Sequence, residues 1–158
     1  MPERSAGLLV WRREPALEVW IAHMGGPFWA KKEARAWSIP KGLYDASEEE
    51  PLAAALREFA EEMGTDAPAP PEGVGYEELG DFRQRSGKIV VAYAVEAPEF
   101  DLATVTSNTF PLEWPPRSGR TIEVPEVDRA EWTPLDVARE RLVVGQVPLL
   151  DALLARHG

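Results

Sequence analysis

The sequence predicts a single α+β domain, or a mixed-sheet sandwich, over residues 1–158. Three observations support this fold class. The length suits one compact domain and leaves little room for a second. Strand-like runs precede helix-like runs in an order that contains no repeated βαβ unit. The chain has no cysteine, and a chain of this size can fold around a hydrophobic core without disulfides.

Two strand-like runs open the chain. Residues 6–11 and 17–22 flank the polar residues 12–15, a spacing that is typical of a β-hairpin. The first run is almost wholly apolar, which indicates a strand that is buried on both faces. After a loop, residues 36–39 predict a further short strand.

The clearest helix lies between Pro51 and Gly64. Proline suits the first helical turn because it has no N–H to lose there, and glycine suits the left-handed position just past the last turn. An apolar stripe at helical spacing is expected to face the core, and it consists of Leu52, Leu56, Phe59 and Met63.

The second half of the chain predicts strands followed by helices. Residues 66–72 contain three prolines and predict a stiff connector. Residues 76–83 and 88–96 predict a hairpin, and residues 101–116 are expected to be irregular. Four elements complete the prediction: strands at residues 118–124 and 130–133, and helices at about residues 134–142 and 147–156.

The charge balance narrows the range of partners. The chain has 17 Lys+Arg against 27 Asp+Glu, a net charge of -10. Such an acidic protein repels phosphate backbones and anionic membranes, so we expect neither nucleic acid nor membrane as a partner. The first residues do not resemble a signal peptide, and no apolar run approaches the ~20 residues that span a bilayer. The sequence therefore predicts a cytoplasmic protein.

Over half of this charge gathers around the predicted helix. Residues 45–62 contain seven acids and one base. Glu58, Glu61 and Glu62 share one helix face, which is expected roughly opposite the apolar stripe. A solvated surface is the ordinary explanation for an acidic helix. However, like charges at this spacing repel, and a divalent cation would convert repulsion into coordination; oxygen ligands without His or Cys suit Mg²⁺ or Mn²⁺.

Lys41 and Gly42 stand where the predicted strand of residues 36–39 gives way to a loop. Gly42 permits a tight backbone path that lets its carbonyl face the same ions. Lys41 is suited to bind a phosphate. Ions held by carboxylates beside a basic residue favour attack on a phosphate ester or anhydride.

Residues 42–65 resemble the Nudix box, whose signature is Gly, five residues, Glu, seven residues and then Arg-Glu-aliphatic-any-Glu-Glu-any-Gly-aliphatic. Gly42, Glu49 and residues 57–64 carry the match. Six residues instead of five separate Gly42 from Glu49, so either the loop has one extra residue or Glu48 takes the ligand position. Thr65 also stands where an aliphatic residue is usual.

The resemblance implies the Nudix fold, a mixed β-sheet sandwiched between α-helices. It also implies Mg²⁺-dependent hydrolysis of a diphosphate linked to another moiety, with Mn²⁺ as a substitute metal. Arg57 would orient a glutamate through a salt bridge, and Glu61 or a glutamate from a later loop would deprotonate the attacking water. Family members are often dimers, which leaves a homodimer open. By position, the implied metal ligands are Glu49, Glu58, Glu61, Glu62 and the carbonyl of Gly42.

Glu126 lies just before the predicted strand of residues 130–133. Similar Nudix proteins often place a further metal-binding or basic glutamate in this region, so Glu126 is a catalytic candidate. An ordinary surface glutamate is the competing interpretation.

Substrate recognition is expected outside the box. Trp29 is the better surface candidate for stacking a base, whereas Trp37 is expected in the core. Lys31 follows Trp29 in a basic stretch that is suited to bind a polyphosphate. Lys41 is suited to the same role. Arg117 and Arg120 follow a Trp-Pro-Pro turn and offer two guanidinium groups for phosphate.

The sequence thus predicts a Nudix pyrophosphohydrolase that acts on a nucleoside diphosphate derivative, such as a dinucleoside polyphosphate or a nucleoside triphosphate. The alternative is a non-catalytic Nudix-like domain that binds a nucleotide as a sensor. The three helix glutamates favour the enzyme, because a domain that only binds has no need of their mutual repulsion.

Overall fold

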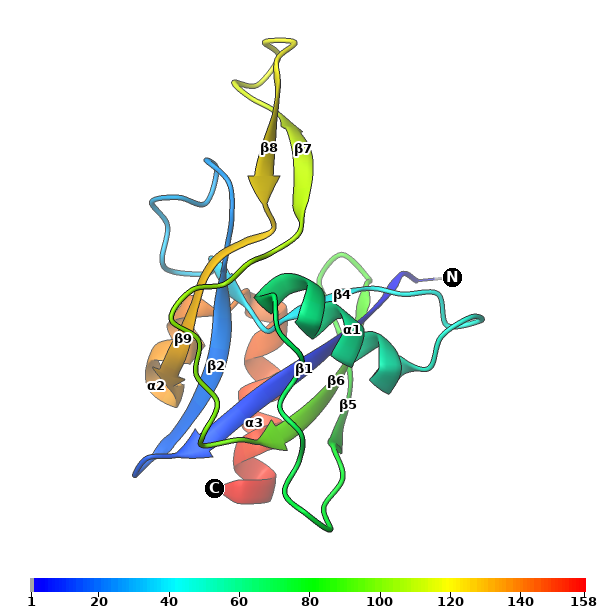
Figure 1. Cartoon of the computed structure of the whole chain (residues 1–158), viewed down its shortest axis with the longest axis vertical. Coiled ribbons are helices and arrows are strands. Elements are labelled where there is room, and N and C mark those ends of the chain that lie inside the picture. Colours follow the sequence, from blue (N-terminus) through cyan, green and yellow to red (C-terminus); the bar gives the residue numbers. More distant parts are fainter. Residues whose placement is uncertain (1) are drawn as a thin grey trace.

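The structure is a computed structural model that describes residues 2–158. Figure 1 shows a β-sheet with helices on both sides and a separate two-stranded hairpin that projects away from it. The elements follow one another as β1 (Arg4–Arg13), β2 (Leu17–Met24), β3 (Trp37–Ser38), β4 (Lys41–Leu43), α1 (Pro51–Met63), β5 (Glu77–Arg83), β6 (Ile89–Glu96), β7 (Thr109–Glu113), β8 (Thr121–Pro125), β9 (Val127–Pro134), α2 (Leu135–Arg141), a 3-10 turn (Val144–Gln146) and α3 (Val147–His157).

The main sheet is mixed, as predicted. Its strand order is β3-β2-β1-β6-β5, and β4 and β9 pair with β1 and β2. β1 runs parallel to β6 and antiparallel to β2 and β4. The predicted opening hairpin is confirmed, because β1 and β2 pair up to Arg13 and Leu17 around the turn.

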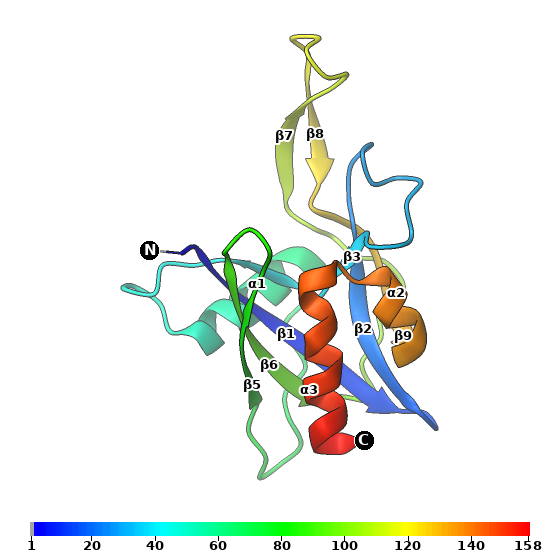
Figure 2. The same ribbon diagram turned by 180° about the vertical axis from the view of Figure 1, so that it is seen from behind.

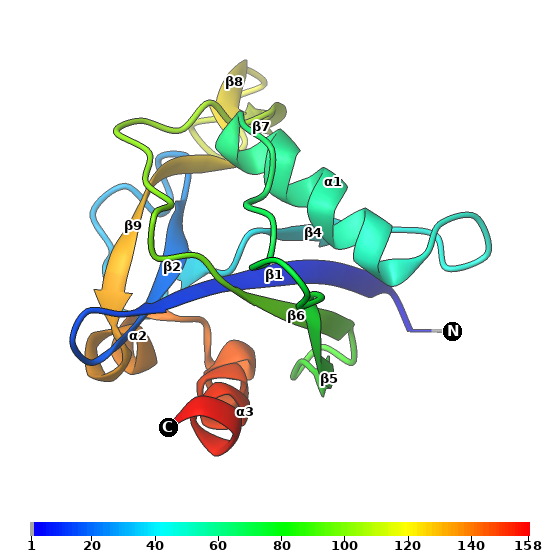
Figure 3. The same ribbon diagram turned by 60° about the horizontal axis from the view of Figure 1, so that its bottom comes forward.

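Helices cover both faces of the sheet, with α1 on one side and α3 on the other (Figures 2 and 3). Because side chains alternate along a strand, β1 supplies both faces. Leu9 packs in the core cluster that contains Leu149 and Leu153 of α3. Its neighbour Leu8 packs with Phe59 of α1 on the opposite face. This explains the unbroken apolar run of β1 and confirms the α+β sandwich.

Helix α1 begins and ends where the sequence predicts. Pro51 occupies its first turn, and Gly64 caps its end with φ 78°, donating its N–H to the carbonyl of Ala60 at 2.9 Å. The expected placement of the three glutamates is wrong in part: Glu58 and Glu62 are only 8% and 9% exposed. They do not lie opposite the apolar stripe, because this flank of α1 packs over β1 and β4.

Two predictions about local structure are corrected. Residues 101–116 are not wholly irregular, because β7 forms within them and pairs with β8 from Thr109↔Pro125 to Glu113↔Thr121. The proline within β7 obscured this strand, although an edge of a two-stranded ribbon tolerates it. Residues 41–43 form strand β4 against β1, where the sequence predicted a loop. Within residues 2–158, no helix is both long and apolar enough to cross a membrane.

Candidate active site

A pocket of about 430 Å³ opens between α1, β4 and the start of β9. It is lined by four carboxylates, which we call the pocket carboxylates: Glu58, Glu61, Glu62 and Glu126. Lys41 and Lys88 also line it, together with Ser5, Gly42 and Leu43. Residues from five places in the sequence therefore meet in one polar hollow.

Gly42 lies close against the Glu58 side chain of α1. A Cβ atom at this position would lie 2.0 Å from Oε2 of Glu58, so the carboxylate would have to move away from its observed position. Gly42 pairs with Ala6 in the β1–β4 ladder. The missing side chain thus allows the Glu58 carboxylate to lie directly against the backbone of β4.

Arg57 binds three carboxylates at the edge of the pocket. Its Nε and Nη2 donate to both oxygens of Glu49 at 2.9 Å, and its Nη1 donates to Glu58 at 2.8 Å and to Glu61 at 3.2 Å. These bonds, that to Glu49 first, raise the pKa of the Arg57 guanidinium. The hydrogen bond from Arg57 lowers the pKa of Glu49. Glu48, by contrast, is exposed, so Glu49 is the acid that contacts the arginine.

Burial changes the protonation of the pocket. It raises the pKa of Glu62 to about 8, against the stabilising hydrogen bond that the backbone N–H of Lys41 donates to Oε1 at 3.3 Å. Burial also raises the pKa of Glu58, and that of Glu126, where the charge of Glu61 adds to the effect. Desolvation lowers the pKa of Lys41. Carboxylates with raised pKa values in a hollow are typical of a functional site.

Comparison with known proteins agrees with this geometry. A family model described as the NUDIX domain matches residues 1–153. The chain belongs to the NUDIX family. The pocket carboxylates other than Glu126, together with Gly42 and Arg57, are the positions of its Nudix box.

Solved structures with a similar Nudix fold share little sequence with this chain. They include an Ap4A hydrolase of C. elegans (18% identity, 96% of each chain, TM-score 0.65) and the NUDIX domain of Shewanella oneidensis NrtR complexed with ADP ribose (19% identity, 100% of this chain and 90% of that one, TM-score 0.60). A MutT protein from Methanosarcina mazei Go1 is also similar (16% identity, 99% and 97%, TM-score 0.58). Such likeness shows the fold alone. A search of curated proteins found no match.

The donor set of the Nudix pocket fits a hard divalent cation. Its carboxylates offer oxygen ligands, and the tight packing at Gly42 leaves room for the backbone to approach them. Within residues 2–158, no three acidic or histidine side chains already converge as a metal-binding group. Arg57 donates hydrogen bonds to Glu58 and Glu61. Their carboxylates would therefore have to rotate away from Arg57 to bind a metal.

The structure separates the predicted substrate-binding residues into two groups. Lys41 lies in the Nudix pocket, whereas Trp29, Lys31, Arg117 and Arg120 do not line it. Trp29 is half-buried against the core, and the exposed aromatic residue of its loop is Phe28, at 56%. Arg117 and Arg120 lie in the connection between β7 and β8, the hairpin that projects away from the main sheet (Figure 1). Trp37 is fully buried, as expected.

Lys88 is a pocket residue that the sequence did not reveal. It follows the β5–β6 turn, and its Nζ pairs with Glu3 at 3.3 Å. Its charge contributes to the lowered pKa of Lys41, so the two ammonium groups lie close enough to interact. The parallel pairing of β1 with β6 brings this turn to the pocket. The only sequence feature of Lys88 is a basic side chain beside a predicted turn. Many surface residues share this feature, so it does not indicate a pocket residue.

Proposed function

We propose that this chain is a Mg²⁺-dependent Nudix pyrophosphohydrolase. It would cleave the diphosphate linkage of a nucleoside diphosphate derivative, such as a dinucleoside polyphosphate or a nucleoside triphosphate. The observation that carries the proposal is the meeting of the pocket carboxylates with Lys41 and Lys88 in one hollow. The fold relatives named for Ap4A hydrolysis and for an ADP-ribose complex support a nucleotide substrate class.

The residues divide the work. Glu58, Glu61, Glu62 and the Gly42 carbonyl would hold Mg²⁺ or Mn²⁺, with Glu49 acting on them through Arg57. When bound, the metal would screen the negative charge of the diphosphate. Lys41 and Lys88 would bind the non-bridging phosphate oxygens.

The proton transfer needs a carboxylate near the reacting phosphorus. Glu61 or Glu126 would take the proton from water as its oxygen bonds to one phosphorus. The bond from that phosphorus to the bridging oxygen breaks, and the proton finally goes to the leaving phosphate. Arg57 would keep Glu58 and Glu61 oriented, since it donates to both.

A substrate screen tests this function. The protein is incubated with dinucleoside polyphosphates, nucleoside triphosphates and nucleotide sugars in Mg²⁺, Mn²⁺ or EDTA, and the products are resolved by mass. We expect metal-dependent cleavage that is lost in E61Q or E62Q and kept in E72Q, which changes an exposed acid of the 66–72 connector. Full turnover in E61Q and E62Q would refute the assignment of these ligands.

The second candidate function is nucleotide sensing without hydrolysis. It is supported by the likeness to the NrtR NUDIX domain, whose structure holds ADP ribose. Calorimetry on the same panel distinguishes the two functions. Nucleotide binding without any product would favour the sensor.

A further inference from the structure

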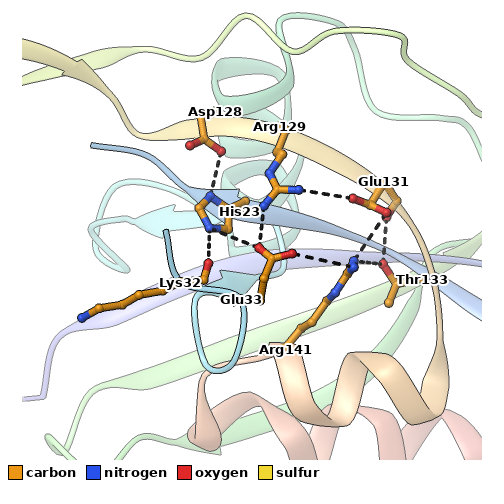
Figure 4. A network of polar contacts seen from close by, with 8 residues as sticks. All are labelled: His23, Lys32, Glu33, Asp128, Arg129, Glu131, Thr133 and Arg141. Carbon is orange, nitrogen blue, oxygen red and sulfur yellow. Dashed lines mark hydrogen bonds and ion pairs between the residues drawn. The ribbon is translucent and has the colours of Figure 1, made fainter. Parts of the chain in front are cut away.

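His23 lies outside the pocket, at the end of β2, and is fully buried. Both of its ring nitrogens have a partner (Figure 4). Nδ1 lies 2.8 Å from Oδ1 of Asp128, and Nε2 lies 2.7 Å from the backbone carbonyl oxygen of Lys32. One side chain thus joins β2 to strand β9 and to the loop of residues 25–36.

The two partners determine the protonation of the ring. A carbonyl oxygen and an ionised carboxylate can only accept hydrogen bonds. A neutral imidazole has a single N–H and would leave one contact without a donor. Both contacts are satisfied when His23 is an imidazolium that donates from both nitrogens.

The surrounding charges agree with an imidazolium. Two acids approach the ring, and a third acid and two arginines extend the cluster, so a positive His23 makes the group neutral. Arg129 binds Glu33 at 2.5 Å, and Arg141 lies 3.5 Å from Glu131. Glu33 also approaches Nε2 of the ring at 3.9 Å. We call this group the His23 network, which consists of His23, Glu33, Asp128, Arg129, Glu131 and Arg141 (Figure 4).

The His23 network adjoins the segment that carries Glu126. The pairing of β2 with β9 shifts register between His23 and Met24. Just beyond the shift, the N–H of Gly25 donates to the carbonyl of Glu126 at 3.0 Å. Asp128 follows Glu126 by two residues, so the His23–Asp128 bond fixes the chain directly after the pocket glutamate.

We propose that His23 is a positioning residue that, as an imidazolium, holds Glu126 in the pocket through Asp128 and holds the 25–36 loop through the Lys32 carbonyl. This proposal rests on the proposed function for its effect on turnover. The role of His23 does not depend on which nucleotide is cleaved. Glu126 lines the pocket and is one of the two glutamates proposed to take the proton, whereas His23 acts only through its neighbours.

The contact between His23 and Asp128 can be removed by mutation. D128A removes the bond from His23 to β9 and should lower kcat by about 10- to 100-fold, the range found when a residue that supports a metal ligand is removed. KM should change little. D128N keeps a hydrogen bond, because its amide can donate to Nδ1 of a neutral ring. It should therefore retain most of the activity. E131Q is the matched control, because it removes a charge of the His23 network that does not contact His23.

A double-mutant cycle distinguishes positioning from a general loss of structure. If Asp128 acts through Glu126, D128A should lower kcat much less in an E126Q background than in the wild-type protein. Equal losses in both backgrounds would overturn the proposal, as would a D128N variant as impaired as D128A. Circular dichroism and melting curves for all variants show whether each is folded.

The protonation state has its own measurement. Nitrogen-15 NMR of the His23 ring should show two protonated nitrogens in the wild-type protein at neutral pH and one in D128N. A neutral ring in the wild-type protein would overturn the imidazolium. This measurement does not need turnover, so it tests the His23 contacts even if no substrate is cleaved. In that case only the proposed function fails.

Discussion

The candidate active-site pocket and the His23 network are both dense charged clusters, but their charge balance differs. The pocket contains four carboxylates and two lysines, and burial raises the pKa values of three of the acids. In the His23 network, three acids face three basic groups, and each acid has a basic partner within 4.0 Å. In the pocket, Arg57 pairs with Glu58 and Glu61, but within residues 2–158 neither Glu62 nor Glu126 has an ion-pair partner.

This difference supports the ligand-binding role that we propose for the pocket. Buried like charges are destabilising unless something neutralises them. In the His23 network, neutralisation is internal, so the cluster can hold segments of chain together. In the pocket it is incomplete, and this is the gap that the proposed divalent cation would fill. The strongest tests remove charge from one cluster at a time.

The largest effect is expected for E62Q. Glutamine keeps an oxygen to accept the hydrogen bond from Lys41 but cannot supply a negative ligand, so turnover should fall by about 100-fold or more. The same change should stabilise the metal-free protein at pH 9, where wild-type Glu62 is a buried charge. Activity assays and thermal melts in EDTA measure both. A metal-free E62Q that melts below the wild-type protein at pH 9 would contradict this account of the pocket.

The next effect concerns the lysines that oppose the carboxylates. K88M should raise KM about 10-fold with kcat nearly unchanged, because a charge-assisted hydrogen bond to a phosphate contributes binding energy to substrate and transition state alike. R85M is the matched control, since Arg85 lies in the same β5–β6 turn but does not line the pocket. Steady-state kinetics on the best substrate of the screen decide the matter. An equal rise of KM in R85M would assign the effect to overall charge.

The contrast between Lys88 and the box residues shows what the sequence could predict. The sequence predicts Glu58, Glu61 and Glu62, because helical spacing places them together within one short segment. Lys88 reaches the pocket through the pairing of β1 with β6, strands that lie far apart in the chain. No local pattern records such a contact.

The fold shows the same limit. The apolar runs and the cap at Gly64 predicted β1, β2 and α1, because burial and backbone conformation there depend on neighbouring residues. The β7–β8 ribbon and the short strand β4 depend on their pairing partners. The His23 network joins β2, a loop, β9 and α2, so no local pattern in the sequence brings its members together.

A smaller effect links the pocket to pH. The pKa of Glu62 rises from 4.5 to about 8 on folding. The folded protein therefore binds more protons than the unfolded one, and the metal-free free energy of unfolding should fall as pH rises through that range. Protons compete with the metal for the same carboxylate, so Mg²⁺ should stabilise the protein more at pH 8 than at pH 6.

Melting curves with and without millimolar Mg²⁺ measure this coupling. At ten times the dissociation constant, Mg²⁺ would add about 1.4 kcal/mol, a rise of about 3–5 °C for a chain of this size. E62Q serves as the control, because without Glu62 the stabilisation should lose most of its pH dependence. A shift that is equal at both pH values in the wild-type protein would show that Glu62 does not bind the metal.

The smallest effect is expected from E131Q in the His23 network. Glu131 is half-exposed, and its contacts with Arg141 at 3.5 Å and Arg129 at 3.8 Å are near the protein surface. Such pairs contribute about 0–1 kcal/mol, so the melting temperature should fall by no more than a few degrees. The sign matters more than the size: removing an acid from a balanced cluster destabilises it, whereas removing one from the overcharged pocket stabilises the metal-free protein. If both variants moved the melting temperature in the same direction at pH 9, charge balance would not distinguish the two clusters.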